Sequence, residues 1–345
     1  MFSESAFRKA LMKWYRLHRR DLPWRRTTDP YRIWISEIML QQTRVAAVIP
    51  YYERFLARFP NVEALAAAPD ADVLAAWAGL GYYSRARNLQ KAARQIAALG
   101  AFPRDYDCLL TLAGIGDYTA AAIASIAFQL PHAAVDGNVM RVLSRVRNDA
   151  SDISSPRTRD RFQKDADSLI DKRDPGTFNQ AMMELGATIC LPRQPQCLLC
   201  PLTALCQGRA QGRQDQLPVK TRKMQMVDVE KCILIIESDG RVLMWQRPDD
   251  AAKLKGFWDF PEPEQAVGVE SGRVIGEFRH SIVNHNYRIS VLPGRLTGSV
   301  PNGLQWISKA ELEVLPVSTR ARKALTLWRV HVDHKRGDRD TSGFG

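Results

Sequence analysis

The sequence predicts a mainly α-helical first domain followed by an α+β second domain. Three observations support this division: apolar residues recur with the period of a helix before Cys206, a polar and basic stretch follows, and short apolar runs separated by turn residues begin near residue 228. The 345 residues also exceed the roughly 100–200 residues of one ordinary domain. We therefore expect a helical domain over 1–206, a basic linker over 207–227, an α+β domain over 228–332 and a disordered tail over 333–345.

In the first region, Phe7, Leu11, Trp14 and Tyr15 recur on one helix face, and the Ala- and Leu-rich stretch Val62–Leu99 continues that period. Proline and glycine divide the region into short helices. These breaks fall at Asp29-Pro30, Ala68-Pro69, Gly79-Leu-Gly81, Gly114-Ile-Gly116 and Asp174-Pro-Gly176.

In the second region, the apolar runs Lys231–Ile236 and Val242–Trp245 flank an Asp239-Gly240 pair, which is a strong signal for a β-hairpin. Further strands are expected over Tyr287–Leu292 and Gly303–Ile307. The run Ser308-Lys-Ala-Glu311 has the pattern of a capping box that opens a helix. The second domain is therefore expected to be α+β.

The composition, with 45% hydrophobic and 25% charged residues, is that of a globular protein and excludes disorder throughout. No run approaches the 18 or so apolar residues of a membrane span, and the N-terminus lacks the pattern of a signal peptide, so we expect a cytosolic protein. The formal charge of +12 favours a polyanionic partner, of which nucleic acid is the most common.

Four of the six cysteines, Cys190, Cys197, Cys200 and Cys206, are spaced C-x6-C-x2-C-x5-C. Clustered thiols in an intracellular chain are typical of ligands for a metal or an iron–sulfur cluster. A structural zinc site more often uses two C-x2-C pairs, and only one such pair is present here. The spacing favours a 4Fe–4S centre, although spacing alone does not exclude zinc.

The segment Gly114-Ile-Gly116 places two glycines in a tight turn before a helix of small residues. Such a turn lets backbone N–H groups approach a phosphate, but it is also typical of an ordinary helix–turn–helix connection. Further along, Asp136 precedes a helical pattern, where it is suited to capping that helix.

Glu37 lies on an apolar helix face, because about 100° per residue places it between Ile33 and Trp34. Burial raises the pKa of a carboxyl group, and a general acid working near neutral pH requires this. A structural glutamate satisfied by hydrogen bonds is the alternative. The adjacent Gln41 and Gln42 are suited to reading base edges or to a simple surface position.

Together these features resemble the helix-hairpin-helix DNA glycosylases that carry an iron–sulfur cluster, and in particular the MutY-type adenine DNA glycosylases. Five segments carry the closer resemblance, in the order known for that family: Asp21–Arg25, Trp34–Thr43, Gly79–Arg85, Val135–Asn138 and Phe178–Gly186. The resemblance implies a helix-hairpin-helix glycosylase fold over essentially the whole first domain, with the helix-hairpin-helix near 110–123, and a 4Fe–4S cluster held by the four clustered cysteines.

The resemblance also implies removal of adenine mispaired with 8-oxoguanine or guanine in double-stranded DNA, during base excision repair. By matching position, Glu37 protonates adenine at N7, and Asp136 stabilises an oxocarbenium or covalent sugar intermediate. Tyr118 and Asn138 support that intermediate. Related enzymes that also nick the strand have a lysine at the position of Tyr118, so a monofunctional enzyme is expected.

An adenine inside a duplex must be flipped out of the stack to be reached. The resemblance implies an adenine pocket, residues at the vacated stack and a DNA-binding surface. The pocket residues are Trp24, Arg25, Leu40, Gln41 and Gln180, the stack residues are Gln42 and Tyr82, and the DNA-binding residues are Gly114, Gly116, Thr119 and Arg85. For Tyr82, core packing is the alternative.

The second domain resembles the Nudix-like module that reads the oxidised guanine, helped by Gly256–Pro261, but it lacks the glutamate-rich metal box of Nudix hydrolases. It is therefore expected to recognise and not to hydrolyse. The loop that usually carries a hydroxyl and a histidine reads Ser281-Ile-Val283-Asn284-His285 here. Either Asn284 or His285 supplies the contact in a shifted register, or discrimination against plain guanine is weaker. We expect retained but altered recognition.

Two rival functions are compatible with parts of the sequence. The first is a glycosylase of the same fold for uracil, thymine or damaged pyrimidines, which would usually lack the second domain. The second is a non-enzymatic iron–sulfur DNA sensor, which would need no acidic pair. The expected protein is a monomer of the bacterial cytoplasm, associated with the nucleoid and with no membrane partner.

Overall fold

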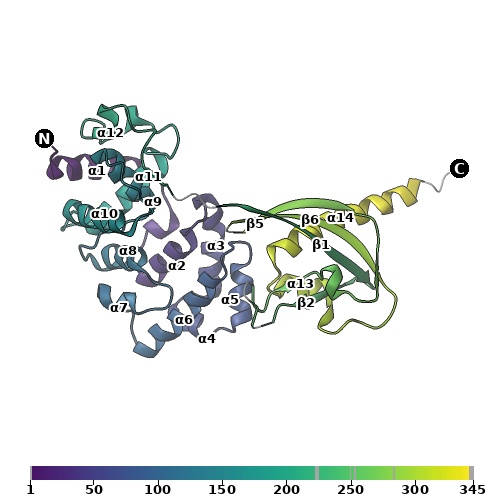
Figure 1. The fold of residues 1–345 in the computed structure, drawn as a ribbon. Coiled ribbons are helices and arrows are strands. Elements are labelled where there is room, and N and C mark those ends of the chain that lie inside the picture. Colours follow the sequence, from purple (N-terminus) through teal and green to yellow (C-terminus); the bar gives the residue numbers. More distant parts are fainter. Residues whose placement is uncertain (1, 222–224, 249, 252–253, 283, 342–345) are drawn as a thin grey trace. The chain divides into compact units, whose positions relative to one another are not determined.

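The computed structural model describes residues 2–221, 225–248, 250–251, 254–282 and 284–341, with side chains described as far as residue 332 (Figure 1). The chain forms two compact units. The first consists of Met1–Ala67 and Asn88–Lys223, and the second of Ala68–Arg87 and Met224–Gly345. In the part that the structure describes, no helix is both long and apolar enough to cross a membrane.

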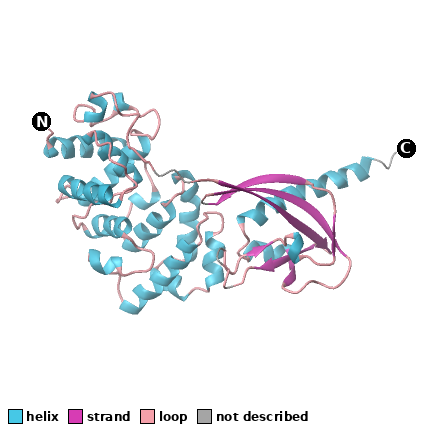
Figure 2. Cartoon of the chain, in the orientation of Figure 1, coloured by secondary structure: helices cyan, strands magenta, loops and turns pink. Residues whose placement is uncertain are grey.

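The first unit is built from helices and loops, as the colours of Figure 2 show. Its helices are α1 (Glu4–His18), η1 (Pro23–Arg25), α2 (Pro30–Leu40), α3 (Val45–Arg58), α4 (Val62–Ala67), most of α6 (Ser84–Leu99), α7 (Tyr106–Leu110), α8 (Asp117–Phe128), α9 (Gly137–Arg147), α10 (Pro156–Leu169), α11 (Pro175–Thr188), η2 (Cys197–Leu199) and α12 (Gln207–Ala210). The prediction of a mainly helical first region is confirmed.

The apolar face predicted for the first helix is part of a buried core. Phe7 and Leu11 of α1 are fully buried and pack with apolar residues of α9, α10 and α11, among them Leu143, Phe162 and Phe178. Proline at the first position and an aspartate or serine just before it start several of these helices, as at α2 and α11. The predicted breaks at Asp29-Pro30 and Asp174-Pro175 are therefore helix starts.

The second unit contains a sheet, two helices after it and α5 (Asp70–Trp77) from the earlier segment. Its strands are β1 (Val227–Ser238), β2 (Arg241–Gln246), β3 (Trp258–Asp259), β4 (Val269–Ser271), β5 (Gly276–Ile282), β6 (His285–Leu296) and β7 (Leu304–Ser308), with the short η3 (Pro263–Gln265) between β3 and β4. Strands β1 and β6 pair in parallel, whereas β5 and β6 form an antiparallel hairpin. The α+β prediction is confirmed.

Two local predictions in this unit are confirmed. Asp239 and Gly240 both have positive φ, +51° and +72°, and connect the antiparallel strands β1 and β2 as a hairpin turn requires. Ser308 and Glu311 form the predicted capping box at the start of α13 (Lys309–Val314). Strands β3, β4 and β5 were not predicted, because β3 and β4 are very short and β5, with the sequence GEFRHSI, has only two large apolar residues.

The expected linker over 207–227 differs from the structure. As far as Thr221 it lies against the first unit: Leu217 is buried and its carbonyl accepts from Arg145 Nε at 2.9 Å, and Ile153 N donates to Val219 O at 3.0 Å. A few scattered apolar residues in a polar stretch give little periodic signal. Residues 222–224 lie outside the described residues, and β1 begins at Val227.

The expected disordered tail also differs from the structure. Helix α14 (Thr319–Thr341) continues over 333–341, and 342–345 lie outside the described residues. Ala321 and Ala324 pack in the core beside the sheet and fix the first turns of the helix. Once a turn is fixed, each further residue adds a hydrogen bond at little cost, so Lys- and Arg-rich sequence can extend the helix without an apolar face.

Candidate active site

Glu37 lies in the last turns of α2 and is 5% exposed, as its apolar helix face predicts. Its Oε2 atom accepts a hydrogen bond from the Tyr118 hydroxyl at 2.5 Å. Burial raises the pKa of Glu37 to about 7, and the nearby Asp136 adds to this, while the Tyr118 hydrogen bond and the Arg25 charge oppose it. The side chain is therefore close to half-protonated at neutral pH.

Asp136 is the N-cap of α9, so the capping alternative is confirmed. Its Oδ1 accepts from Val139 N at 2.8 Å and its Oδ2 from Asn138 Nδ2 at 2.7 Å. Burial raises the pKa of Asp136, and these hydrogen bonds oppose the rise. The Asp136 carboxylate also lines the same pocket as Glu37. It can therefore cap α9 and still place its charge next to a ligand in that pocket.

That pocket has a volume of about 950 Å³. It brings together ten of the residues predicted from the sequence: Trp24, Arg25, Glu37, Leu40, Gln41, Gln42, Tyr118, Asp136, Asn138 and Gln180. They come from η1, α2, α8, α9 and α11 and from the turn after α2. Residues distant in the sequence thus form one cavity large enough for a nucleobase with its sugar.

Sequence reasoning missed Glu184, which is 1% exposed at the wall of this pocket. It accepts from Arg20 Nε at 2.8 Å and Nη2 at 2.6 Å, and from Arg25 Nη2 at 2.8 Å. Although burial raises its pKa, the two arginines outweigh that effect and bring the pKa of Glu184 to about 2. Its spacing of four residues from Gln180 on one helix was a signal that both share a face.

Gln180 is held in place by a hydrogen bond from Tyr15. Its Oε1 accepts from the Tyr15 hydroxyl at 2.9 Å, which leaves the amide NH₂ as the available donor. The Arg25 guanidinium lies over the Tyr15 ring, 5.4 Å from its centroid. Gln180 and Arg25 are therefore both fixed before any ligand enters.

Arg141 connects this pocket with the cysteine loop. Its Nη2 donates to Asn138 Oδ1 at 2.9 Å and to Gly186 O at 2.7 Å, and its Nε donates to Cys190 O at 2.7 Å. Gly186 is required here, because a Cβ at this position would lie 2.6 Å from Asn138 Cβ. The close approach of α9 and α11 holds Asn138 beside Asp136.

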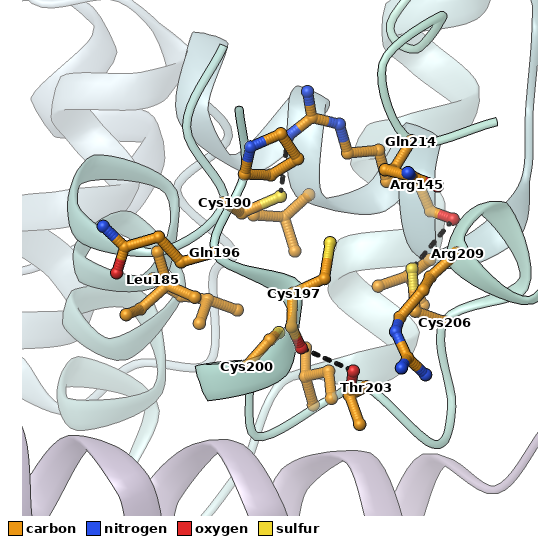
Figure 3. A pocket seen from close by; sticks show the side chains of 15 residues that line it. Arg145, Leu185, Cys190, Gln196, Cys197, Cys200, Thr203, Cys206, Arg209 and Gln214 are labelled. Carbon is orange, nitrogen blue, oxygen red and sulfur yellow. Dashed lines mark hydrogen bonds between the residues drawn. The ribbon is translucent and has the colours of Figure 1, made fainter. Parts of the chain in front are cut away.

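The four clustered cysteines line a second pocket, shown with their sulfur atoms in Figure 3. None of the four is in a disulfide, and the fully buried Arg145 donates to Cys190 Sγ at 3.2 Å. Four thiol donors, an apolar wall and an arginine directed at one sulfur fit a cluster bound through thiolates. Among the described residues, no group of three or more His, Cys, Asp or Glu side chains could hold a single metal ion.

The predicted glycine turn connects α7 and α8. Gly114 has φ +75°, and a Cβ there would lie 2.6 Å from Asn88 Cβ, so this position needs glycine. Gly116 is exposed and precedes α8 without a side-chain cap, which leaves the first amides of the helix available to an anion. Thr119 differs from its expected place on the DNA-binding surface: it is 2% exposed, and its Oγ1 accepts from Gln41 Nε2 at 3.3 Å.

Tyr82 and Arg85 belong to the second unit. Tyr82 is 44% exposed, so the core-packing alternative is wrong, whereas Arg85 is half-buried and donates to the carbonyls of Leu80 and Gly81. Burial lowers the pKa of Arg85 to about 10. Arg85 thus holds the loop that carries Tyr82.

The loop expected to read the opposite base connects β5 and β6 in the same unit. Ser281 Oγ donates to Asn286 Oδ1 at 2.9 Å, and His285 stacks on Tyr287 with ring centroids 5.9 Å apart. Asn284 Nδ2 reaches Gln225 O at 3.5 Å, and Val283 lies outside the described residues. Ser281 and His285 thus have fixed surroundings in the free protein.

A paired acid and carboxylate in a base-sized pocket, beside a hairpin with free amides, define the class of DNA base excision enzymes. A family model described as HhH-GPD superfamily base excision DNA repair protein matches residues 35–167, which contain Glu37, Tyr118, Asp136 and Asn138. The fold agrees: a solved thermostable thymine-DNA glycosylase is 29% identical, covers 60% of this chain and 97% of its own, and has a TM-score of 0.55.

Two relatives narrow the class. Adenine DNA glycosylase of Homo sapiens is 34% identical over 94% of this chain and 74% of the relative. Adenine DNA glycosylase of Mycolicibacterium smegmatis is 46% identical over 59% of this chain and 69% of the relative. The chain belongs to the adenine DNA glycosylase family, and the similarity to the human relative extends over both units.

Proposed function

We propose that this protein excises adenine mispaired with 8-oxoguanine, or with guanine, as a monofunctional DNA glycosylase of base excision repair. The observation that carries the proposal is the pairing of Glu37 with Asp136 in one pocket: an acid with a pKa of about 7 and a capped carboxylate. A DNA sensor without catalysis would need neither.

In the proposed reaction, adenine leaves the base stack and enters the pocket, where Glu37 protonates N7. The glycosidic electron pair leaves with the protonated base, and the positive charge that develops on the sugar lies near Asp136. Water then adds to the sugar carbon as a hydroxyl group, and the proton that it releases restores the acid form of Glu37. Gln180, which Tyr15 fixes, and Arg25, which Glu184 fixes, hold the adenine.

The absence of a lyase step is part of the proposal. A Schiff base needs an amine beside the sugar, and the position expected for it holds Tyr118. No lysine is present among the described residues that line the pocket. The products are then free adenine and an intact strand with an abasic site.

Cys190, Cys197, Cys200 and Cys206 would hold a 4Fe–4S cluster, which would supply structural cross-linking of the loop after α11. Arg145 supports this through its bond to Cys190 Sγ. The hairpin Gly114–Gly116 would contact the DNA backbone through its free amides. The second unit is proposed as a Nudix-like recognition domain for the opposite base, through Ser281, Asn284 and His285, and a monomer bound to one duplex suffices for this.

The test uses three duplexes, with adenine opposite 8-oxoguanine, adenine opposite guanine and uracil opposite guanine. Strand cleavage is scored with and without alkali. Alkali-dependent cleavage of the adenine strand is expected, and a Glu37→Gln variant should bind the duplex but leave it uncleaved. Cleavage without alkali would contradict a monofunctional enzyme, and processing of uracil alone would contradict the substrate.

A further inference from the structure

The segment Ala68–Arg87 interrupts the helical region in the sequence but forms a compact unit with the C-terminal residues. A ring contact and a hydrogen bond contribute to this connection. The rings of Tyr83 and Phe257 lie 4.1 Å apart between centroids, with Tyr83 7% and Phe257 0% exposed, and Arg87 Nη2 donates to Lys255 O. The same unit contains the loop between β5 and β6 that is expected to read the opposite base.

Tyr83 is directly connected to the loop that presents Tyr82. Its hydroxyl accepts from Gly79 N at 3.3 Å, while Trp77 Nε1 donates to Gly81 O at 3.1 Å. Tyr82 itself has φ +48°, a conformation that a bulky residue rarely adopts. Such a conformation persists where its surroundings fix it, and Tyr83 is one of those surroundings.

The other side of the contact is fixed as well. Gly256 N donates to Arg247 O and Arg247 N to Phe257 O, both at 2.8 Å, so Gly256 and Phe257 are both bonded to the backbone of Arg247. The Arg247 side chain pairs with the fully buried Asp259 at 3.1 Å. Phe257 is therefore held rigidly against Tyr83.

We propose that Phe257 and the Lys255 carbonyl position Tyr82, so that the second domain holds both the side chain at the DNA stack and the loop that reads the opposite base. This rests on the proposed function, in which Tyr82 enters the base stack. Phe257 acts through Tyr83 and the loop 79–82, and it touches neither adenine nor the reacting atoms.

The test is a double-mutant cycle on the full-length protein, read as the single-turnover rate with adenine opposite 8-oxoguanine. Tyr82→Ala and Phe257→Ala should each lower this rate by roughly tenfold to a hundredfold, since small misplacements cost this much. The double variant should be no slower than Tyr82→Ala alone, within about twofold, and Phe257→Leu should restore most of the rate. If the two rate losses multiply in the double variant, the proposal is overturned.

Arg87→Gln provides a second cycle that leaves the core intact, in case Phe257→Ala folds poorly. It should also lose its effect in the Tyr82→Ala background. Arg94→Gln, a charge removed from the same helix in the first unit, is the matched control, and its effect should multiply with that of Tyr82→Ala. Equal behaviour of Arg87→Gln and Arg94→Gln would overturn the proposal.

Hydrogen exchange of the free protein tests the same connection without any activity. In Phe257→Ala, backbone amides of 79–87 should exchange at least about tenfold faster, while those of α9 keep their rates. Unchanged exchange over 79–87 would overturn the proposal even if adenine is excised. If the wild-type protein does not excise adenine but Phe257→Ala still shows this faster exchange over 79–87, only the proposed function is contradicted.

Discussion

The alkaline limb of the pH–rate profile tests the role of Glu37 as general acid. With a pKa of about 7, half of the Glu37 side chains are protonated at pH 7, about one tenth at pH 8 and about one hundredth at pH 9. Single-turnover excision should therefore fall about fivefold from pH 7 to pH 8 and about tenfold from pH 8 to pH 9. On the acid side the rate should also fall, because Asp136 must be ionised and burial raises its pKa.

Replacing Tyr118 with phenylalanine should shift the alkaline limb of the pH–rate profile to higher pH. The Tyr118 hydroxyl donates to Glu37 and stabilises its charged form, so its loss raises the pKa of Glu37. A hydrogen bond to a charged group contributes about 1.5–3 kcal/mol, and one pKa unit corresponds to about 1.36 kcal/mol. The limb should thus move upward by about one to two units, whatever happens to the maximal rate.

The control is Tyr15→Phe, which removes a hydroxyl bonded to Gln180 and not to Glu37. Its maximal rate should change, but its alkaline limb should stay at the wild-type pH. The assay is excision from adenine opposite 8-oxoguanine between pH 5.5 and 9 on buffers of constant ionic strength. A flat profile above pH 7, or a downward shift in Tyr118→Phe, would refute the assignment of Glu37 as the acid.

Four further outcomes are expected. Glu37 binds a proton more tightly in the folded protein than in the unfolded chain, so the free energy of unfolding falls as pH rises from 4.5 to about 7. Glu37→Gln removes the cost of ionising this buried group and should raise the unfolding free energy at pH 8 by about 3 kcal/mol, measured by urea titration. Asp136→Asn should abolish excision but bind duplex within about tenfold of wild type by fluorescence anisotropy, because asparagine also caps helices; an equal loss of binding would count against its role at the sugar. Duplex affinity should fall steeply with salt, as the charge of +12 suggests, and a flat dependence would contradict phosphate contacts. The purified protein should be brown, with visible absorbance that Cys200→Ala weakens, and a colourless zinc-loaded sample would contradict the iron–sulfur assignment.

The sequence predicts burial and backbone conformation wherever a regular helix or turn determines them. The burial of Glu37 followed from the period of one helix, and the hairpin at Asp239-Gly240 from the backbone angles that such a turn requires. The convergence of distant residues on one pocket came from the family resemblance, since spacing along the chain carries no such information. Periodicity alone would have left Glu37 and Asp136 as two unrelated carboxylates.

What the sequence did not predict depends on contacts between distant residues. Glu184 lies within a recognised segment, but its role follows from Arg20 and Arg25, which reach it from another part of the chain. Within the second unit, Tyr83 of the segment 68–87 meets Phe257. Neither contact leaves a periodic pattern, because each is made by single side chains.

The two interpretations of Asp136 that the sequence left open, cap and catalyst, are physically linked. Burial in the pocket favours the neutral acid, which would be useless beside a cationic sugar. The hydrogen bonds from Val139 N and Asn138 favour the charged form, and the N-terminus of α9 adds a partial positive charge. Glu37 lacks these helix amides, and burial raises its pKa to about 7. In the proposed mechanism, the position of each carboxylate on its helix, at the start for Asp136 and near the end for Glu37, therefore separates the base-protonating role from the charge-stabilising one.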